Sequence, residues 1–425
     1  MVIAVMFILM FVLFMLTVPV AIALGLASSV ALVMIDMPIG FVAQQYFTGL
    51  NSFTLLAIPF FILAGTVMEH TGISQKIVDF VGTMVGHYTG GYATVLIVAC
   101  LFFGALSGSA AATVAAIGGI MVPHMVKKGY DARFATATAA ASAGLAVIIP
   151  PSISMILYCV ATNVSITDLF TAGFIPGIFL GLTEIAYAHH VSKKQGFKGD
   201  KKYTGAEKWQ SFKSAIWALF MPVIILGGIY GGFFTATEAS AVAVAYALFV
   251  GFFIYRTLNL KKLFEVFKES AIMVTVIMLV LSTAQLFAYI LTYANVPGNV
   301  ANWFISFASN KYMFLILINI FLLIVGMFFD PGPGMIILAP ILAPAASAFG
   351  IDLVHFGLIM VINFSIGAIT PPFAVNLFVA SQIGSVKFEQ IVRPILPYIG
   401  LLIVDLLIIT YIPQLSLFLP NLLGS

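Results

Sequence analysis

The stretch that decides the fold is IPPSISMILYCVAT, residues 149–162, in which a proline pair interrupts a long apolar segment. A second stretch, TPPFAVNLFVASQI, residues 370–383, matches it when the sequence is shifted by 221 positions. The same ungapped shift aligns four further pairs of identical residues: Pro123 with Pro344, Gly129 with Gly350, Asp131 with Asp352, and Pro176 with Pro397. The sequence therefore predicts two related halves, 1–191 and 214–425.

The composition places these halves in a membrane. Of the 425 residues, 62% are hydrophobic and only 8% are charged, whereas soluble domains carry roughly 25% charged residues. Lipid rather than water must therefore cover most of the surface, and helices are the form in which such segments satisfy their backbone. We expect an all-α polytopic membrane protein.

The basic residues set the predicted topology. Seven of the 18 Lys and Arg lie between Lys193 and Lys213, and short basic loops stay in the cytoplasm. Residues 192–213 are thus expected to form a cytoplasmic linker, whose segment KWQSFKSAIW (208–217) is amphipathic and predicted to lie along the inner surface. The apolar start is predicted to be a first span and not a cleavable signal, although the side on which the N-terminus lies stays open. Reading outward from the linker predicts ten spans: 2–16, 19–35, 52–69, 133–162, 170–190, 214–232, 236–255, 270–293, 353–384 and 394–418.

Two apolar stretches, 92–125 and 312–346, do not fit this alternation. Each is too long for one span and is interrupted, by GALSGSAAAT (104–113) and by FFDPGPG (328–334). A re-entrant hairpin explains both, because irregular backbone inside a membrane must be buried in protein or line a wet cavity. Each half then holds about five helices and one hairpin. Since five is odd, the halves must have opposite orientations, an architecture found in ion-coupled transporters.

The two proline pairs point to a cation. Each pair removes backbone donors and frees carbonyls one turn earlier, near Gly144 and Val147 in the first half and near Gly367 in the second. Hydroxyls of Ser107 and Thr370 could complete two shells of neutral oxygens, which suit a weakly held Na⁺. The alternative is a kink that serves packing, with neighbouring Ser and Thr satisfying the carbonyls.

The other helix ends favour an anion. Half-helix N-termini are expected near Ala110, Ser152, Gly334 and Phe373, and such ends attract carboxylates. Nearby side chains that could add hydrogen bonds to a substrate are Ser109, Thr113, Ser152, Ser154 and Asn376. Asp330, at the second hairpin tip, either caps the following helix or lies near the cation.

Other functions find little support in the residues. The sequence lacks the motifs HExxH, CxxC and GxSxG, and it lacks a nucleotide-binding glycine loop with a lysine. Neither an enzyme nor an ATP-driven pump is therefore expected. The two cysteines lie in apolar runs, and a net charge of +3 does not suggest a nucleic-acid partner. No chain of buried His, Asp and Glu resembles a proton relay, which favours Na⁺ coupling. Glu184 and Asp405 receive no role.

Five motifs carry a resemblance to a known family. They are GLNSFTLLAIPFFILAG (49–65), GALSGSAAATVAAIG (104–118), IIPPSI (148–153), GGIYGGFFTATEASAVAVAYAL (227–248) and AITPPFAVNLFV (368–379). Together they resemble the large membrane subunit of TRAP (tripartite ATP-independent periplasmic) transporters, over essentially the whole chain.

The resemblance implies a Na⁺-driven importer of organic acids in the bacterial inner membrane, working by an elevator mechanism. It implies two partners, a separate small four-helix membrane subunit and a periplasmic substrate-binding protein. Family substrates include C4-dicarboxylates and sialic acids, with a slight preference here for sialic acid. Family sodium sites correspond to Ser107, Gly144, Val147 and Pro150 in the first half, and to Gly326, Gly367 and Thr370 in the second. The alternatives are a transporter that works without a binding protein, a channel, or a membrane scaffold or enzyme that shows no uptake.

Overall fold

The computed structural model describes residues 1–197, 199–308 and 310–423, and within these ranges the chain is helical and contains no strand. Eight of the described helices are long and apolar enough to cross a membrane. The predicted class, an all-α polytopic membrane protein, is therefore confirmed.

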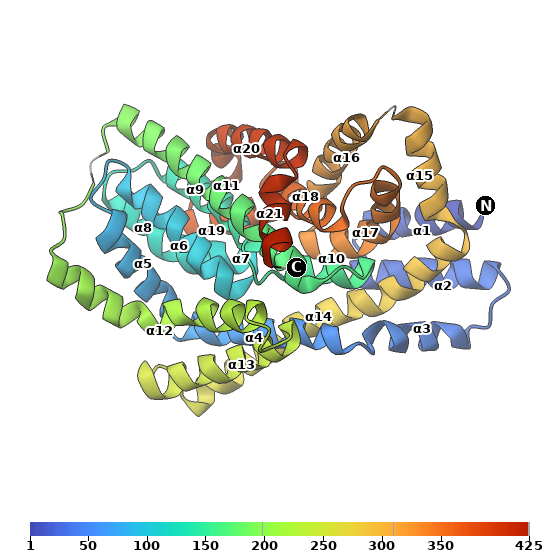
Figure 1. Cartoon of the computed structure of the whole chain (residues 1–425), viewed down its shortest axis with the longest axis horizontal. Coiled ribbons are helices and arrows are strands. Elements are labelled where there is room, and N and C mark those ends of the chain that lie inside the picture. Colours follow the sequence, from blue (N-terminus) through green and yellow to red (C-terminus); the bar gives the residue numbers. More distant parts are fainter. Residues whose placement is uncertain (198, 309, 424–425) are drawn as a thin grey trace.

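The first half starts with helices that precede a hairpin and a broken helix (Figure 1). The first arm of the hairpin is the helix Gly91–Ser107, and the second arm is Ala110–Lys127, which contains a π-helical turn at Val114–Gly118. The broken helix is interrupted between Ala143 and Ile153. The helices are α1 (Val2–Met15), α2 (Val20–Met34), α3 (Gly40–Leu50), α4 (Ala57–His70), α5 (Ile73–Val85), α6 (Gly91–Ser107), α7 (Ala110–Thr113), α8 (Gly119–Lys127), α9 (Ala132–Ala143), α10 (Ile153–Thr162) and α11 (Ile166–Gln195).

The second half repeats the order of hairpin, broken helix and long helix. Its hairpin is interrupted between Gly326 and Pro331, and its broken helix between Gly367 and Val375. The helices are α12 (Gly205–Tyr230), α13 (Ala236–Phe249), α14 (Leu260–Tyr293), α15 (Val296–Phe307), α16 (Lys311–Gly326), α17 (Pro331–Ala348), α18 (Leu353–Gly367), α19 (Val375–Gly384), α20 (Phe388–Tyr411) and α21 (Gln414–Leu423).

Residues that the 221-position shift aligns form the same local structures. Asp131 caps α9 by accepting the N–H of Arg133, and Asp352 caps α18 by accepting the N–H of Val354, both at 2.8 Å. Such caps satisfy backbone donors that a helix start leaves free. The proline pairs 150–151 and 371–372 both contain a cis peptide bond. The opposite membrane orientation of the halves stays a prediction.

The end of the predicted linker is helical. α12 begins at Gly205, so the amphipathic segment belongs to this long helix, and its place along the inner membrane surface stays a prediction. Thr204 and Glu207 explain the early start, because each side chain bonds the backbone N–H of the other residue, at 3.3 and 2.7 Å. This reciprocal capping box fixes the start of the helix.

Several predicted boundaries also move. The expected span 394–418 is divided, since α20 ends at Tyr411 and Pro413 precedes α21. The half-helices expected near Gly334 and Phe373 instead begin at Pro331 and Val375. Short helices α3, α5 and α15 were not predicted.

The helices pack in two groups. In one, α14 lies against α2, α3 and α4, while α4 lies against α13. In the other, α6 packs on α9 and α11, α16 on α18, and α9 on α19 and α20. In Figure 1 the first group follows the lower side of the molecule and the second group lies above it. Contacts of α17 with α10 and α14 join the hairpin of the second half to both groups.

Candidate ion and substrate site

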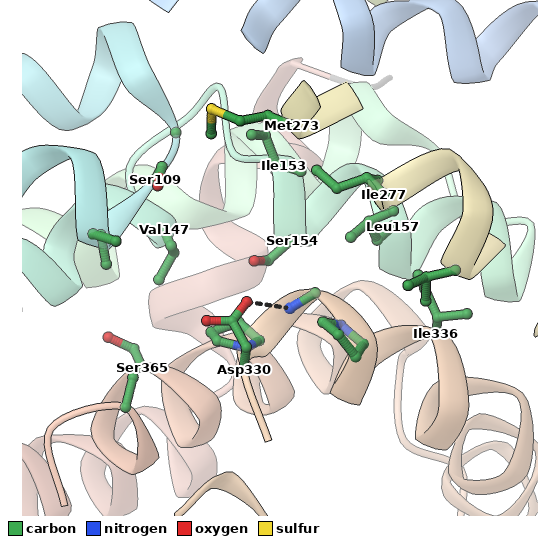
Figure 2. Close-up of a pocket in the computed structure, with 18 of the residues that line it drawn as sticks. Ser109, Val147, Ile153, Ser154, Leu157, Met273, Ile277, Asp330, Ile336 and Ser365 are labelled. Atoms are coloured by element: carbon green, nitrogen blue, oxygen red, sulfur yellow. Dashed lines mark hydrogen bonds between the residues drawn. The ribbon is translucent and has the colours of Figure 1, made fainter. Parts of the chain in front are cut away.

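A cavity of about 370 Å³ lies where the four helix interruptions meet. Each interruption contributes to its wall: the first hairpin tip through Ser109, the first break through Val147, the second tip through Asp330 and the second break through Ala368. Figure 2 shows Ser109, Val147 and Ser154 on one side and Asp330 and Ser365 on the other. The structure thus brings these four regions together around one cavity.

The first hairpin tip carries a group of bonded hydroxyls. Ser107 Oγ lies 3.1 Å from Thr113 Oγ1, and Thr113 Oγ1 donates to the carbonyl of Ser109 at 2.8 Å. Ser109 also caps the returning helix, since its Oγ accepts the N–H of Ala112 at 3.4 Å. Of these three residues only Ser109 lines the cavity, and Ser107 and Thr113 are hydrogen-bonded next to it.

The first break packs against this tip and exposes carbonyls toward it. The backbone of Gly108 is left-handed, with φ +59°, and a Cβ there would lie 2.7 Å from the carbonyl oxygen of Pro151. Ser152 Oγ donates to the carbonyl of Val147 at 2.6 Å, and Pro150 joins Pro151 through the cis bond. The tip of the first hairpin and the proline pair of the first break are therefore in close backbone contact.

A hydrogen bond links the two breaks across the halves. Ser365 Oγ donates to the carbonyl of Gly144 at 2.9 Å, and these residues are 221 positions apart, the register of the repeat. Both predicted carbonyls of the first half, Gly144 and Val147, thus already accept one hydroxyl each. Since a carbonyl oxygen has two lone pairs, each could still bind a cation.

The second half has a similar approach of tip to break. A Cβ on Gly367 would lie 2.4 Å from the carbonyl carbon of Gly326, so the two backbones touch. Thr370 Oγ1 donates to the carbonyl of Ile366 at 2.6 Å, one turn earlier. This hydrogen bond is the one expected if Thr370 serves only to satisfy a carbonyl freed at the kink. Because the hydroxyl donates in it, the lone pairs of Thr370 Oγ1 are still available to bind a cation.

Asp330 both caps a helix and faces the cavity. Its Oδ2 accepts the N–H of Gly332 at 3.4 Å at the start of α17, and its carboxylate points into the space shown in Figure 2. The two roles that the sequence left open are therefore compatible.

The cavity is polar at a few points and otherwise apolar. Among the described residues, its lining includes no Lys, Arg or His. Asn376 lines it, and the Nδ2 of this side chain is buried without a hydrogen-bond partner. A buried donor without a partner is costly, so a ligand that accepts a hydrogen bond from Asn376 would remove this cost.

The predicted site residues divide into two sets. Those that line the cavity are Ser109, Val147, Ser154, Asp330 and Asn376. Those that lie away from its lining are Ser107, Thr113, Gly144, Pro150, Ser152, Gly326, Gly367 and Thr370. Sequence reasoning missed the third wall, formed by Met273, Val276, Ile277 and Val280 of α14, because apolar residues of a span look the same whether they face lipid or a cavity.

Comparison with known proteins identifies the family. Residues 7–415 match the family "Tripartite ATP-independent periplasmic transporter, DctM component". The chain is 42% identical over 382 residues to the C4-dicarboxylate TRAP transporter large permease protein DctM of Pseudomonas aeruginosa, covering 90% of each chain. It is 38% identical over 384 residues to the sialic acid TRAP transporter large permease protein SiaM of Vibrio cholerae, again covering 90% of each.

One relative is longer than this chain, and one solved structure shares its fold. The chain is 42% identical to the isethionate TRAP transporter permease protein DctMQ of Oleidesulfovibrio alaskensis, of whose length the match spans 64%. The crystal structure of the Alcanivorax borkumensis YdaH transporter has the same fold, with a TM-score of 0.64 at 13% identity and coverage of 87% of this chain and 86% of that one.

These matches and the apolar helices indicate a multi-pass protein of the inner membrane. The relatives are permeases and not enzymes, which confirms the expectation that the chain is not an enzyme. The cavity at the meeting point of two hairpins and two broken helices therefore belongs to a transporter subunit, and the chain is a member of the DctM component family, the large permease subunits of TRAP transporters.

Proposed function

We propose that this subunit imports an organic acid anion, of the C4-dicarboxylate or sialic acid class, in symport with Na⁺. The observation that carries the proposal is the arrangement of neutral oxygens behind a cavity in which the side-chain Nδ2 of Asn376 has no hydrogen-bond partner. Relatives named for C4-dicarboxylates and for sialic acid support the substrate class.

The wall residues suggest how an ion could affect the substrate. Ser109 lines the cavity and bonds Thr113, and Ser365 lines the cavity and bonds the carbonyl of Gly144. A Na⁺ held by Ser107, Gly144 and Val147 would therefore order the same segments that contact substrate. The bound Na⁺ would then lower the entropy cost of ordering these segments when the substrate binds. Such an effect of one ligand on the binding of another is positive coupling.

The packing supports an elevator movement. The hairpins and broken helices contact one another, α6 with α9, α10 with α17 and α16 with α18, while α2, α3 and α4 lie against α14 and α13 lies against α4. We propose that the hairpins and broken helices move as the transport domain and that the helices around α14 are the scaffold. The α14 residues Met273 and Ile277 would then be the part of the cavity wall past which the substrate moves.

The proposal includes two partners, a small four-helix membrane subunit supplied as a separate chain and a periplasmic binding protein. The test is uptake of radiolabelled succinate and of radiolabelled N-acetylneuraminic acid into proteoliposomes. We expect uptake of one of them only when this chain, the small subunit and the binding protein are all present. Single-channel current, or equal uptake, from this chain alone would establish the stand-alone alternative and refute the tripartite one.

Ser107→Ala and Thr370→Ala are each expected to raise the Na⁺ concentration that gives half-maximal uptake. One lost neutral oxygen contact is worth ~1 kcal/mol, which corresponds to about a 5-fold change. Uptake as a function of Na⁺ is the measurement, with expression level as a check. Thr275→Ala is the matched control, because Thr275 makes the same bond to the carbonyl four residues earlier, at 2.7 Å, on the exposed surface of α14. Unchanged Na⁺ dependence in both variants would show that the proposed sites are misplaced.

A further inference from the structure

Two buried carboxyl groups outside the cavity have no positive partner. Glu184 of α11 is fully buried and Asp405 of α20 is 2% exposed, and Asp405 is close enough to act on the charge of Glu184. Their residue numbers also differ by 221, the register of the repeat. Neither residue takes part in any ion pair of the described chain.

Two short oxygen contacts at Thr183 compete for a single hydrogen if Asp405 is ionised. Thr183 Oγ1 lies 2.8 Å from the carbonyl oxygen of Leu180 and 2.6 Å from Asp405 Oδ2. A threonine hydroxyl has one hydrogen, and a strong hydrogen bond needs that hydrogen near the line between the two oxygens. If Asp405 were ionised, one of these two short contacts would lack a hydrogen. With a proton on Oδ2, Asp405 donates to Thr183 and Thr183 donates to Leu180.

Glu184 makes an ionised pair still less favourable. Its Oε2 accepts the hydroxyl of Ser142 at 2.6 Å, while its Oε1 is buried without a partner. The titratable groups that act on it electrostatically, besides Asp405, are Tyr398 and Cys100, and neither brings a positive charge. Tyr398 shares its own hydrogen bond with Thr138, at 2.9 Å. Two carboxylates in such an apolar interior, with hydroxyl donors alone, would carry a large desolvation cost.

We propose that Glu184 and Asp405 form a proton-binding pair between α11 and α20, which holds a proton on Asp405 Oδ2 directed at Thr183 Oγ1. The proton is the ligand of this site, and it keeps two facing acids from repelling each other inside the membrane domain. The site is separate from the cavity and does not depend on the Na⁺ assignment.

Infrared spectroscopy of the purified full-length chain tests the proposal. At neutral pH the wild-type spectrum is expected to contain a protonated-carboxyl band that is missing from Asp405→Asn, so that it appears in the difference spectrum. Glu389→Gln is the matched control, because Glu389 is an exposed acid on the same helix α20, and it should leave the band unchanged. A band of equal size in Asp405→Asn, or a band that disappears when Na⁺ replaces K⁺, would overturn the proposal, the latter by making the pair a metal-ion site.

Thr183→Val gives a second readout should Asp405→Asn not fold. This variant removes the proposed acceptor at nearly constant volume, so the band should remain and move to higher frequency; an unmoved band would contradict the assigned direction. The melting temperature of the wild-type protein should also fall with rising pH more steeply than that of Asp405→Asn. The sign follows because at neutral pH the folded state holds a proton on Asp405, whereas this carboxyl is ionised in the unfolded chain, where the pKa of Asp is about 3.9. An equal fall of the melting temperature with pH in the two proteins would contradict a proton bound to Asp405.

Discussion

Uptake by the reconstituted transporter is expected to fall at least ~10-fold when K⁺ replaces Na⁺ outside the vesicles, which equals a selectivity of ~1.4 kcal/mol or more. The proposed ligands are backbone carbonyls and hydroxyls at Ser107, Gly144, Val147 and Thr370, all of them neutral oxygens. The tip and break that hold the first set are in backbone contact at Gly108 and Pro151. Such a packed shell cannot expand easily for the larger K⁺, since interiors of this density resist small changes in volume.

The measurement is the initial rate of uptake of the substrate identified in the three-component assay. Valinomycin with equal K⁺ on both sides should hold the membrane potential near zero, so that only the Na⁺ gradient differs between the arms. Substrate binding to the isolated binding protein in K⁺ medium is the control, because a defect there would also lower uptake. Equal uptake rates in Na⁺ medium and in K⁺ medium would refute the proposed coupling to Na⁺. They would not affect the assignment of the chain to its family.

The architecture could be predicted from the sequence because its signals are local and repeated. Apolar runs gave the spans, and proline pairs at 150–151 and 371–372 gave the breaks around which the cavity forms. The helix starts were less accurate where the signal was a side-chain cap. At Thr204 and Glu207 the capping box extends α12 backward into the expected linker, and Asp330 starts α17 earlier than the glycines suggested.

The sequence could not show which apolar side chains of a membrane helix face the lipid and which face the cavity. Met273 and Ile277 line the cavity, yet nothing in their pattern distinguishes them from lipid-facing residues of α14. The proposed pairing of Glu184 with Asp405, in contrast, has a signal in the sequence, because the two residues are 221 positions apart. In the predicted inverted repeat, equivalent residues would meet only near the axis that relates the halves, and Ser365 and Gly144, which are also 221 positions apart, do form a hydrogen bond. Buried polar residues separated by the repeat register are therefore candidates for contacts across the axis.

Gly367→Ala is expected to abolish uptake and to lower the melting temperature strongly. The added Cβ would lie 2.4 Å from the carbonyl carbon and 2.5 Å from the carbonyl oxygen of Gly326. Both atoms are backbone at the end of α16, so no side chain can turn aside and the hairpin must separate from the broken helix. Overpacking of this kind costs about 1–3 kcal/mol or more, and here it also displaces a carbonyl proposed to bind Na⁺.

Two further substitutions turn this expectation into a graded series. Gly326→Ala places its Cβ 3.3 Å from the Gly367 Cα, so its effect should be intermediate, whereas Gly400→Ala on α20 meets no atom within 4 Å and should behave as wild type. Melting temperature and Na⁺-driven uptake of the three variants are the measurements. The helix propensity of alanine favours each variant over glycine, so a loss that follows the order Gly367, Gly326, Gly400 can only come from the contact. Wild-type stability and uptake of Gly367→Ala would mean that tip and break are farther apart than the structure places them, and the second cation site would lose its basis.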